Sequence, residues 1–412
     1  MNGEILAIGD ELTSGRIINS TSYFAASHLF AAGHKVTAMA TVGDDPKRIG
    51  YALLKAIGRA DFVVVTGGLG STTDDITSEA VSEALDLPQT LYPEVLELIK
   101  ECEAFKKMPT MEKMAWLPSG AEVLKPGAKM AGFMLVYEQK PVFFLPGVPH
   151  QMRELMLDRV IPRLATWQDN TFSLVRQKVF NVFGLEEAII NDRLASLEEE
   201  GDQVRIGYYP MGAEVHVSLT VRGDTAVQAD ALFQAKSNGI HQALADVIYG
   251  EDNDTMASVT GALLAIHHCS LACAESCTGG LMSHMITGVA GSSDYFLGGV
   301  VAYANQVKEQ LLGVKPQTLI EQGAVSEETA RQMALGVRAA TGASLGVAIT
   351  GIAGPGGGTP GKPVGTVCFG LATKQMVQGF TFEFSGNRAM VQGQAATMGL
   401  DLLRRYLLNL PN

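Results

Sequence analysis

The sequence has little cysteine and tryptophan, and fewer basic than acidic residues. Five cysteines among 412 residues are too few, and odd in number, to form a disulfide framework. Lysine and arginine number 31 against 43 aspartate and glutamate residues, which gives a net charge of −12. Because nucleic-acid-binding proteins usually carry a basic face, we expect small-molecule partners and consider nucleic acid unlikely as a ligand.

Long apolar runs are also absent. No stretch approaches the roughly 20 apolar residues that a membrane span needs, and the N-terminal segment MNGEILAIGDE has no basic region before its apolar residues. We therefore expect a cytoplasmic protein with no membrane association. The length suggests two or three domains, and 47% hydrophobic with 18% charged residues is ordinary for a globular protein.

Three cysteines, Cys269, Cys273 and Cys277, are spaced by four residues. In an extended strand such residues lie about 13 Å apart, so they cannot share one metal ion. The spacing therefore does not indicate a metal site.

The first 168 residues show the pattern of a doubly wound α/β domain. Three short apolar segments are expected as strands: Gly3–Ile8, Lys35–Thr41 and Asp61–Thr66. One helix should begin near Asn19 or Ser20 and stop at Gly33, and another should begin with Asp45 as cap and Pro46 in the first turn. A strand that is hydrophobic on both faces, such as the third, is typical of a parallel sheet covered by helices.

The third strand runs into a glycine-rich loop, GGLGSTTDDIT, at Gly67–Thr77. Backbone N–H groups in such a loop can face phosphate oxygens, and Asp74 and Asp75 could hold a divalent cation between them. The alternative is an acidic helix cap after a tight turn.

Residues 169–252 predict a small βαββαβ domain. Its expected elements are a strand at Phe172–Phe183, a helix at Leu185–Leu197, strands at Val204–Tyr209 and Glu214–Arg222, a helix at Thr225–Ala245 and a short strand at Val247–Tyr249. The acidic segment Glu251–Thr255 is the expected linker to a third domain, residues 253–412.

In this third domain a buried strand, Ser270–Ala274, is followed by Ser276 and by two glycines that open a helix. Ser276 thus lies on a strand-to-helix turn, where free N–H groups favour an oxyanion. Gly279 and Gly280 would let a substrate approach the backbone closely. The position suits a nucleophile; the alternative is that Ser276 only caps the helix.

A serine nucleophile needs a base, and a second buried strand, Gly298–Ala304, leads to Tyr303, Asn305 and Lys308. The spacing from Ser276 to Lys308 is that of one βαβ crossover, so both residues can meet at one edge of a parallel sheet. Burial would lower the pKa of Lys308 and make it a general base. Alternatively, Lys308 is a solvated surface charge.

Further along, a buried strand at Leu345–Thr350 opens into a glycine- and proline-rich loop, GIAGPGGGTPGKPVGT, that suits wrapping of a polar ligand. Two more strands, Gly365–Ala372 and Val377–Phe384, precede the last helix. Arg388 stands at the start of that helix, where its guanidinium could bind a phosphate. An ordinary surface arginine is the alternative.

Four motifs of the third domain resemble the C-terminal domain of the competence/damage-inducible protein CinA family. They are AESCTGG (274–280), GGVVAYANQVKEQLLGV (298–314), GAVSEETA (323–330) and ITGIAGPGGG (349–358). The resemblance implies a nicotinamide-nucleotide amidohydrolase, which deamidates nicotinamide mononucleotide (NMN) to nicotinic acid mononucleotide and ammonia without a cofactor. It makes Ser276 the nucleophile and Lys308 the base, with Tyr303 as a further catalytic residue. The substrate-binding residues expected here are Thr278, Gly279, Gly280, Asn305, Thr350, Gly351 and Arg388.

The first domain resembles the N-terminal CinA domain, which is of the molybdopterin-binding type, through its GGLG loop and LPGVPHQM (145–152). The resemblance implies a metal-dependent ADP-ribose pyrophosphatase. Asp44, Asp74 and Asp75 are then the metal ligands, with Mg²⁺, Mn²⁺ or Co²⁺ as candidate ions. Asp75 is also catalytic, and Gly67, Gly68 and Gly70 bind substrate. The family's middle domain is described as KH-like, but residues 171–250 lack G-x-x-G, so we expect a spacer or a dimerising module.

Together these readings predict a bifunctional pyridine-nucleotide recycling enzyme, acting on NMN and ADP-ribose and assembled as a homodimer. One alternative is a nucleotide-binding regulatory protein linked to competence. Another is a molybdopterin-processing N-terminal domain, which is disfavoured because Leu69 replaces the usual threonine of that loop.

Overall fold

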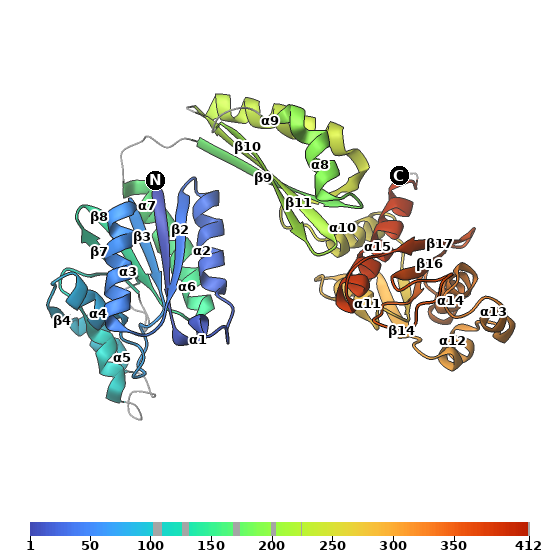
Figure 1. The fold of residues 1–412 in the computed structure, drawn as a ribbon, viewed down its shortest axis with the longest axis horizontal. Helices are drawn as coiled ribbons and strands as arrows, with labels where there is room; N and C mark the ends of the chain where they lie inside the picture. The colour runs from blue at the N-terminus through green and yellow to red at the C-terminus, as the bar shows by residue number, and fades with distance from the viewer. Residues whose placement is uncertain (102–108, 126–131, 168–173, 199–202, 224, 411–412) are drawn as a thin grey trace. The chain divides into compact units, whose positions relative to one another are not determined.

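The computed structural model describes residues 1–101, 109–125, 132–167, 174–198, 203–223 and 225–410 (Figure 1). Two compact units are present: Met1–Arg176 with Arg222–Ala229, and Gln177–Val221 with Asp230–Asn412. The expected boundary between residues 168 and 169, and the expected start of a strand at Phe172, lie outside the described residues. None of the helices that the structure describes has the length and apolar character required to cross a bilayer.

The first unit is built on a six-stranded sheet in the order β2-β1-β3-β8-β7-β6. Strands β2, β1, β3 and β8 run parallel to one another, and β7 and β6 extend the sheet beyond β8 through antiparallel pairs. The strands are β1 (Asn2–Ile8), β2 (Lys35–Val42), β3 (Phe62–Thr66), β6 (Glu122–Val123), β7 (Phe133–Tyr137) and β8 (Lys140–Leu145). A separate antiparallel pair consists of β4 (Gln89–Leu91) and β5 (Trp116–Pro118).

Helices cover both faces of this sheet, as the two-sided apolar character of its central strands predicts. In β3, Val63 and Val65 point into the core with α3 and α4, whereas Phe62 and Val64 point into the core with α2 and α6. The helices are α1 (Asp10–Thr13), α2 (Ser20–Ala31), α3 (Pro46–Arg59), α4 (Thr77–Ala84), α5 (Pro93–Lys100), α6 (Pro149–Leu155) and α7 (Ile161–Trp167). Short non-α turns lie at η1 (Pro109–Ala115) and η2 (Met156–Val160). The doubly wound prediction is confirmed.

The side-chain caps predicted for α2 and α3 are present in the structure. The Asn19 side chain accepts a hydrogen bond from Ser22 N at 3.0 Å at the start of α2. The Asp45 carboxylate accepts one from Arg48 N at 2.8 Å at the start of α3, where Pro46 occupies the first turn. Such caps satisfy N–H groups that have no partner within the helix.

The second unit begins with the βαββαβ arrangement. Its sheet has the order β10-β11-β9-β12, and its helices pack on it through one apolar cluster. The elements are β9 (Leu174–Phe183), α8 (Glu187–Leu194), η3 (Ala195–Leu197), β10 (Val204–Met211), β11 (Glu214–Gly223), α9 (Ala226–Leu244), η4 (Ala245–Val247) and β12 (Ile248–Glu251). This small domain packs directly on the part of the unit that follows it. Its Phe183 and Tyr249 lie in the hydrophobic core of that following part, and the Arg404 side chain donates a hydrogen bond to Asp246 O at 3.0 Å.

The rest of the second unit is a mixed five-stranded sheet in the order β14-β13-β15-β16-β17. Strands β14, β13 and β15 are parallel, and β16 and β17 are antiparallel. The strands are β13 (Leu271–Glu275), β14 (Phe296–Val301), β15 (Leu345–Gly351), β16 (Thr366–Ala372) and β17 (Val377–Glu383). The helices are α10 (Met256–Ile266), α11 (Leu281–Thr287), η5 (Ser292–Asp294), α12 (Asn305–Leu312), α13 (Pro316–Glu321), α14 (Glu327–Thr341) and α15 (Arg388–Leu408).

Alternate side chains of β13 pack into two different hydrophobic cores, one on each face of the sheet. Leu271 and Cys273 pack with α10, α11 and α15, whereas Ala272 and Ala274 pack with α12 and α14. The central strands β13, β15 and β16 are therefore buried on both sides, and the parallel strands end together at one edge of the sheet. That edge carries the predicted serine and lysine.

Candidate active sites

Ser276 follows the carboxyl end of β13 and is 8% exposed. Its backbone N–H donates to Ile349 O of the neighbouring strand β15 at 2.8 Å, which fixes the turn against the sheet. Because β14 pairs in parallel with β13 on the other side, the residues after β14 reach the same edge.

Lys308 comes to this edge as the fourth residue of α12, which begins at Asn305. The side chain is buried, with 1% of the residue exposed, so the solvated alternative is wrong. Its Nζ lies 3.0 Å from Ser276 Oγ and donates to Ala302 O at 2.7 Å and Tyr303 O at 3.1 Å. The structure therefore brings the predicted pair together.

The environment of Lys308 shifts its pKa toward the neutral amine. Burial lowers the pKa of Lys308, an effect that the nearby Cys277 thiol partly opposes. A neutral amine has two N–H groups and one lone pair, and two carbonyl oxygens lie within reach of the N–H groups. The lone pair is then left for the proton of Ser276.

Glu275 is a site residue that the sequence reasoning missed. Its carboxylate is 1% exposed and accepts hydrogen bonds from Gly280 N, Met282 N and Ser283 N at 2.8–3.1 Å, and from Ser283 Oγ at 2.7 Å. An internal carboxylate therefore occupies the start of α11. The expectation that this helix end would favour an oxyanion at Ser276 is wrong, because its N–H groups already serve Glu275. The sequence signal for this role was a glutamate at the end of an apolar strand, directly before the candidate nucleophile.

A pocket opens beside Ser276 and collects most of the predicted site residues of this domain. Its lining consists of Ser276, Cys277, Tyr303, Asn305, Lys308, Ala324, Val325, Thr350, Gly351, Ala353 and Arg388. Thr278, Gly279 and Gly280 do not line it. Gly279 and Gly280 have φ angles of +63° and +98°, so the turn itself explains both glycines.

Arg388 and Tyr303 close the other side of this pocket. Arg388 is the first residue of α15, whose N-cap Asn387 accepts from Met390 N at 3.1 Å. The guanidinium donates to Gly354 O at 2.8 Å and to the Tyr303 hydroxyl at 3.2 Å. Gly354 of the glycine-rich loop thus holds the Arg388 guanidinium in the lining of the pocket.

In the first unit, the predicted glycine loop also lies at the carboxyl edge of its sheet. The Asp75 carboxylate accepts from Thr72 N at 2.9 Å and Thr72 Oγ1 at 2.6 Å, and a Cβ on Gly70 would lie 2.4 Å from Asp75 Oδ2. Gly70 is therefore required for the loop to pack against this carboxylate. Gly67 N–H is engaged with Leu145 O at 3.0 Å.

The predicted metal ligands Asp44, Asp74 and Asp75 line one pocket with Glu11. Burial raises the pKa of Asp44, and Asp10, Glu11 and Asp74 raise it further by repulsion. Within the described residues no three His, Cys, Asp or Glu side chains are already arranged to hold a metal ion. The donor set still fits Mg²⁺, which is commonly held by one or two carboxylates together with water and substrate phosphates.

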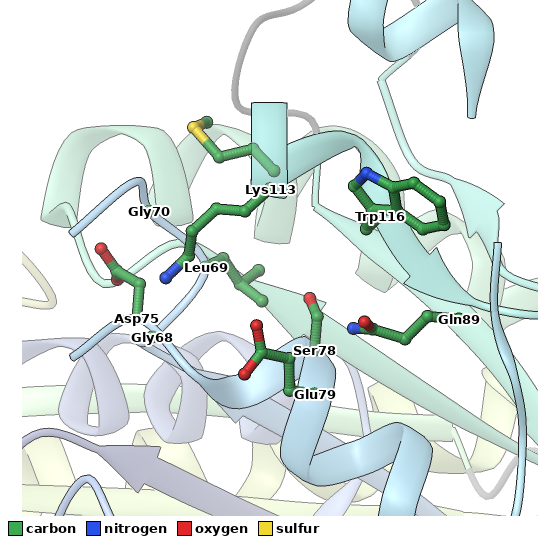
Figure 2. A pocket seen from close by; sticks show the side chains of 10 residues that line it. Gly68, Leu69, Gly70, Asp75, Ser78, Glu79, Gln89, Lys113 and Trp116 are labelled. Carbon is green, nitrogen blue, oxygen red and sulfur yellow. The ribbon is translucent and has the colours of Figure 1, made fainter. Parts of the chain in front are cut away.

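A second pocket also borders this loop, and Figure 2 shows the side chains that line it. The two pockets share Gly68, Leu69, Gly70 and Asp75. Asp75 therefore lines both pockets.

Three family models match successive parts of the chain. Residues 4–166 match a family described as a probable molybdopterin binding domain, residues 177–250 match the damage-inducible protein CinA KH domain, and residues 253–407 match the CinA C-terminal domain.

Full-length relatives carry the same family name. A CinA-like protein of Desulfotalea psychrophila is 49% identical over 99% of this chain and 99% of its own. A putative competence-damage inducible protein of Moorella thermoacetica is 38% identical over 99% of each chain. A crystal structure of a competence or damage-inducible protein from Enterobacter asburiae is 34% identical, covers 38% of this chain and 99% of its own, and superposes with a TM-score of 0.36. The chain therefore belongs to the CinA family, with a molybdopterin-binding-type domain at its N-terminus.

Proposed function

We propose that the C-terminal domain hydrolyses the carboxamide of NMN, giving nicotinic acid mononucleotide and ammonia. The observation that carries this proposal is a buried lysine amine 3.0 Å from a serine hydroxyl at the edge of a pocket. Serine is a poor nucleophile until a base removes its proton, and a buried amine of lowered pKa is such a base.

In the proposed reaction, Ser276 Oγ attacks the carboxamide carbon as its proton moves to Lys308 Nζ. The Lys308 ammonium then gives that proton to the departing nitrogen, and ammonia leaves an ester on Ser276. Water, activated by the neutral lysine, hydrolyses the ester, so the sum is amide plus water to acid plus ammonia. Arg388 supplies a cation for the 5′-phosphate, and the Tyr303 hydroxyl, held by Arg388, is placed to bind the substrate.

The test is the release of ammonia from NMN by the purified protein. Ser276→Ala should abolish release, while Ser293→Ala, which changes an exposed serine of the same domain, should not alter it. Wild-type activity in Ser276→Ala would refute the proposal.

We further propose that the N-terminal domain hydrolyses ADP-ribose to AMP and ribose 5-phosphate. The support for this proposal is the pair of pockets that meet at Asp75, because ADP-ribose has two ribosyl halves joined by a pyrophosphate. Asp44, Asp74 and Asp75 would hold a divalent cation, which would neutralise phosphate charge and activate water. Without a cation, these carboxylates would repel the doubly anionic linkage.

Chelation separates the two proposed activities. Removing divalent cations should stop cleavage of ADP-ribose and leave deamidation of NMN unchanged. Asp75→Asn should also stop cleavage, whereas Asp86→Asn, an exposed position just after α4, should cleave normally. Equal loss of both activities on chelation would contradict this assignment.

We propose that the protein works as a homodimer in the cytoplasm.

A further inference from the structure

One wall of the pocket beside Ser276 is a short piece of irregular chain between α13 and α14. It consists of residues 322–326, and its Ala324 and Val325 belong to the pocket lining. We call it the 322–326 segment. None of its residues lies in a helix or a strand, so its backbone groups must find their hydrogen-bond partners elsewhere.

Lys362 holds both ends of the 322–326 segment. Its Nζ donates to Gln322 O at 2.7 Å and to Val325 O at 2.6 Å. Lys362 is itself fixed in the glycine- and proline-rich loop, where Thr359 N donates to Lys362 O at 2.8 Å and Lys362 N donates to Thr359 O at 3.0 Å. Because Lys362 does not line the pocket, it can influence the pocket only through the carbonyl groups that it binds.

Two hydroxyl groups hold the middle of the 322–326 segment. Thr329 Oγ1 of α14 donates to Gly323 O at 2.8 Å, and Thr350 Oγ1 of β15 donates to Ala324 O at 2.8 Å. The residue before Thr350 accepts a hydrogen bond from Ser276 N at 2.8 Å. Adjacent residues of β15 therefore hold the candidate nucleophile and the 322–326 segment.

This arrangement leaves the N–H groups of the 322–326 segment free. In a trans peptide group the C=O and N–H bonds point in opposite directions. Because four consecutive carbonyl groups point toward the side chains that bind them, the N–H groups that follow, from Gly323 to Ser326, point the other way. Among the residues that the structure describes, none of these four N–H groups has a hydrogen-bond acceptor. Successive free N–H groups of this kind form concave sites for anions.

The proposed deamidation needs such donors. As Ser276 Oγ attacks the carboxamide carbon, negative charge develops on the carbonyl oxygen, and fixed N–H groups aimed at that oxygen lower the barrier. The N–H groups at the start of α11 are already bound to Glu275, and Ser276 N is bound to Ile349 O. The donors must therefore come from another part of the pocket.

We propose that the N–H groups of Ala324 and Val325 bind the oxyanion that forms from the substrate carbonyl, and that Lys362 is the positioning residue that orients them. This inference rests on the proposed deamidation of NMN and specifies which backbone groups receive the developing charge. The hydrogen bonds from Lys362, Thr329 and Thr350 fix the donors before the substrate arrives, so little reorganisation is needed as the charge develops.

Lys362→Met tests the positioning role, because methionine keeps much of the apolar stem and removes both hydrogen bonds. We expect kcat for ammonia release from NMN to fall roughly 10- to 10³-fold, up to the usual cost of losing one oxyanion donor. KM should change little, since an interaction made only in the transition state lowers kcat and kcat/KM equally. Lys362→Arg, which can still donate to both carbonyl groups, should recover much of the rate. Lys374→Met, which changes an exposed lysine of the same domain, is the matched control and should keep the wild-type kcat.

Thr350→Val gives an independent test from the other side of the 322–326 segment. Valine has nearly the shape of threonine, so this buried position should stay filled while Ala324 O loses its donor. We expect kcat to fall and KM to change little, as for Lys362→Met. A raised KM with unchanged kcat in both variants would show that the segment binds the ground state of the substrate, and the oxyanion assignment would be wrong.

The thioamide analogue of NMN separates oxyanion binding from a general loosening of the pocket. It carries sulfur in place of the carbonyl oxygen, and sulfur is a larger atom and a weaker hydrogen-bond acceptor. The wild-type protein should therefore release ammonia from NMN much faster than from the thioamide. Lys362→Met should slow the reaction of NMN more than that of the thioamide, so the ratio of the two rates should shrink. An unchanged ratio would mean that Lys362 only stabilises the fold.

A probe without nicotinamide distinguishes failure of this inference from failure of the proposed function. With an alkyl fluorophosphonate, Ser276 Oγ forms a bond to phosphorus, fluoride leaves and the serine proton moves to Lys308, while the phosphoryl oxygen needs the same N–H donors. If the wild-type protein releases no ammonia from NMN, but mass spectrometry shows that Ser276 is modified more slowly in Lys362→Met than in wild type, the donor assignment stands and the deamidation proposal fails. If NMN is deamidated and Lys362→Met keeps both the wild-type kcat and the wild-type ratio of oxygen to sulfur substrate, the reaction stands and this inference is refuted.

Discussion

Replacing Lys308 with methionine tests whether the buried amine acts as the base. Methionine keeps much of the apolar stem and removes the ionisable group, so the packing at the sheet edge should survive. We expect ammonia release from NMN to fall about 10²- to 10⁴-fold, the usual contribution of a positioned general base. The variant also leaves Ala302 O and Tyr303 O without the donor they now share.

Because nucleophile and base act as a unit, the double variant Ser276→Ala with Lys308→Met should be little slower than either single variant. The assay is a continuous ammonia measurement with saturating NMN, supported by circular dichroism of each variant. Multiplicative losses in the double variant would show that the two residues act independently, and the dyad would be refuted.

The pH dependence follows from the direction of the pKa shift. Burial lowers the pKa of Lys308 below its ordinary value of 10.5, and only the neutral amine can accept the serine proton. The rate should therefore rise with pH through a pKa that lies below 10.5 and level off above that pKa. A rate that does not change between about pH 6 and pH 9, with chemistry shown to limit turnover, would contradict a lysine base.

The same shift predicts how the stability of the fold depends on pH. Between the lowered folded pKa and the unfolded value of 10.5, the unfolded chain binds more protons at Lys308 than the folded chain. The contribution of this group to the free energy of unfolding should therefore increase as pH rises through that window, and it is lost as pH falls through the folded pKa. Urea denaturation of wild type and Lys308→Met should show the variant gaining relative stability toward low pH. An unchanged difference across pH would refute the shift.

Three further predictions concern residues with defined partners. Arg388→Ala should weaken NMN by about 10- to 150-fold and the phosphate-free riboside little, in matched steady-state kinetics, because a charge-assisted contact is lost; equal losses would make Arg388 structural. Glu275→Gln should lower the free energy of unfolding by about 1.5–3 kcal/mol, since an amide cannot accept all four hydrogen bonds; unchanged urea denaturation would show that the cap contributes nothing. Asp401→Asn should destabilise the second unit by about 3–5 kcal/mol, because Asp401 is 2% exposed and pairs with Arg404 and Arg405; an unchanged calorimetric melting temperature would contradict this.

The elements that depend on local chemistry were predictable from the sequence. Asp45 before Pro46 marks a helix start, because a side-chain oxygen next to a proline is enough to begin a helix, and Asp45 caps α3 as predicted. The meeting of Ser276 with Lys308 was also predictable, because parallel neighbouring strands bring their carboxyl ends to one edge.

The missed features depend on contacts that local patterns do not encode. Glu275 faces the start of α11 only because the turn passes through two glycines of positive φ, which directs Gly280 N, Met282 N and Ser283 N toward its carboxylate. The pocket lined by Gln89 and Trp116 depends on β4 and β5, which are three residues each and too short to show an alternating pattern.

The two candidate sites would each bind a phosphate-bearing substrate, but the charges of their lining residues have opposite signs. Both proposed substrates carry phosphate, and both sites lie where parallel strands end in a glycine-containing turn. The described lining of the C-terminal pocket contains Lys308 and Arg388 and no carboxylate, since Glu275 faces the helix start instead. The pocket holding Asp44, Asp74 and Asp75 contains no lysine or arginine in its lining. The C-terminal site can therefore attract an anion through Arg388, whereas the carboxylates of the N-terminal site would repel an anion unless, as we propose, a cation binds there. This difference in charge, rather than the shared strand-and-turn layout, is why chelation should separate the two activities.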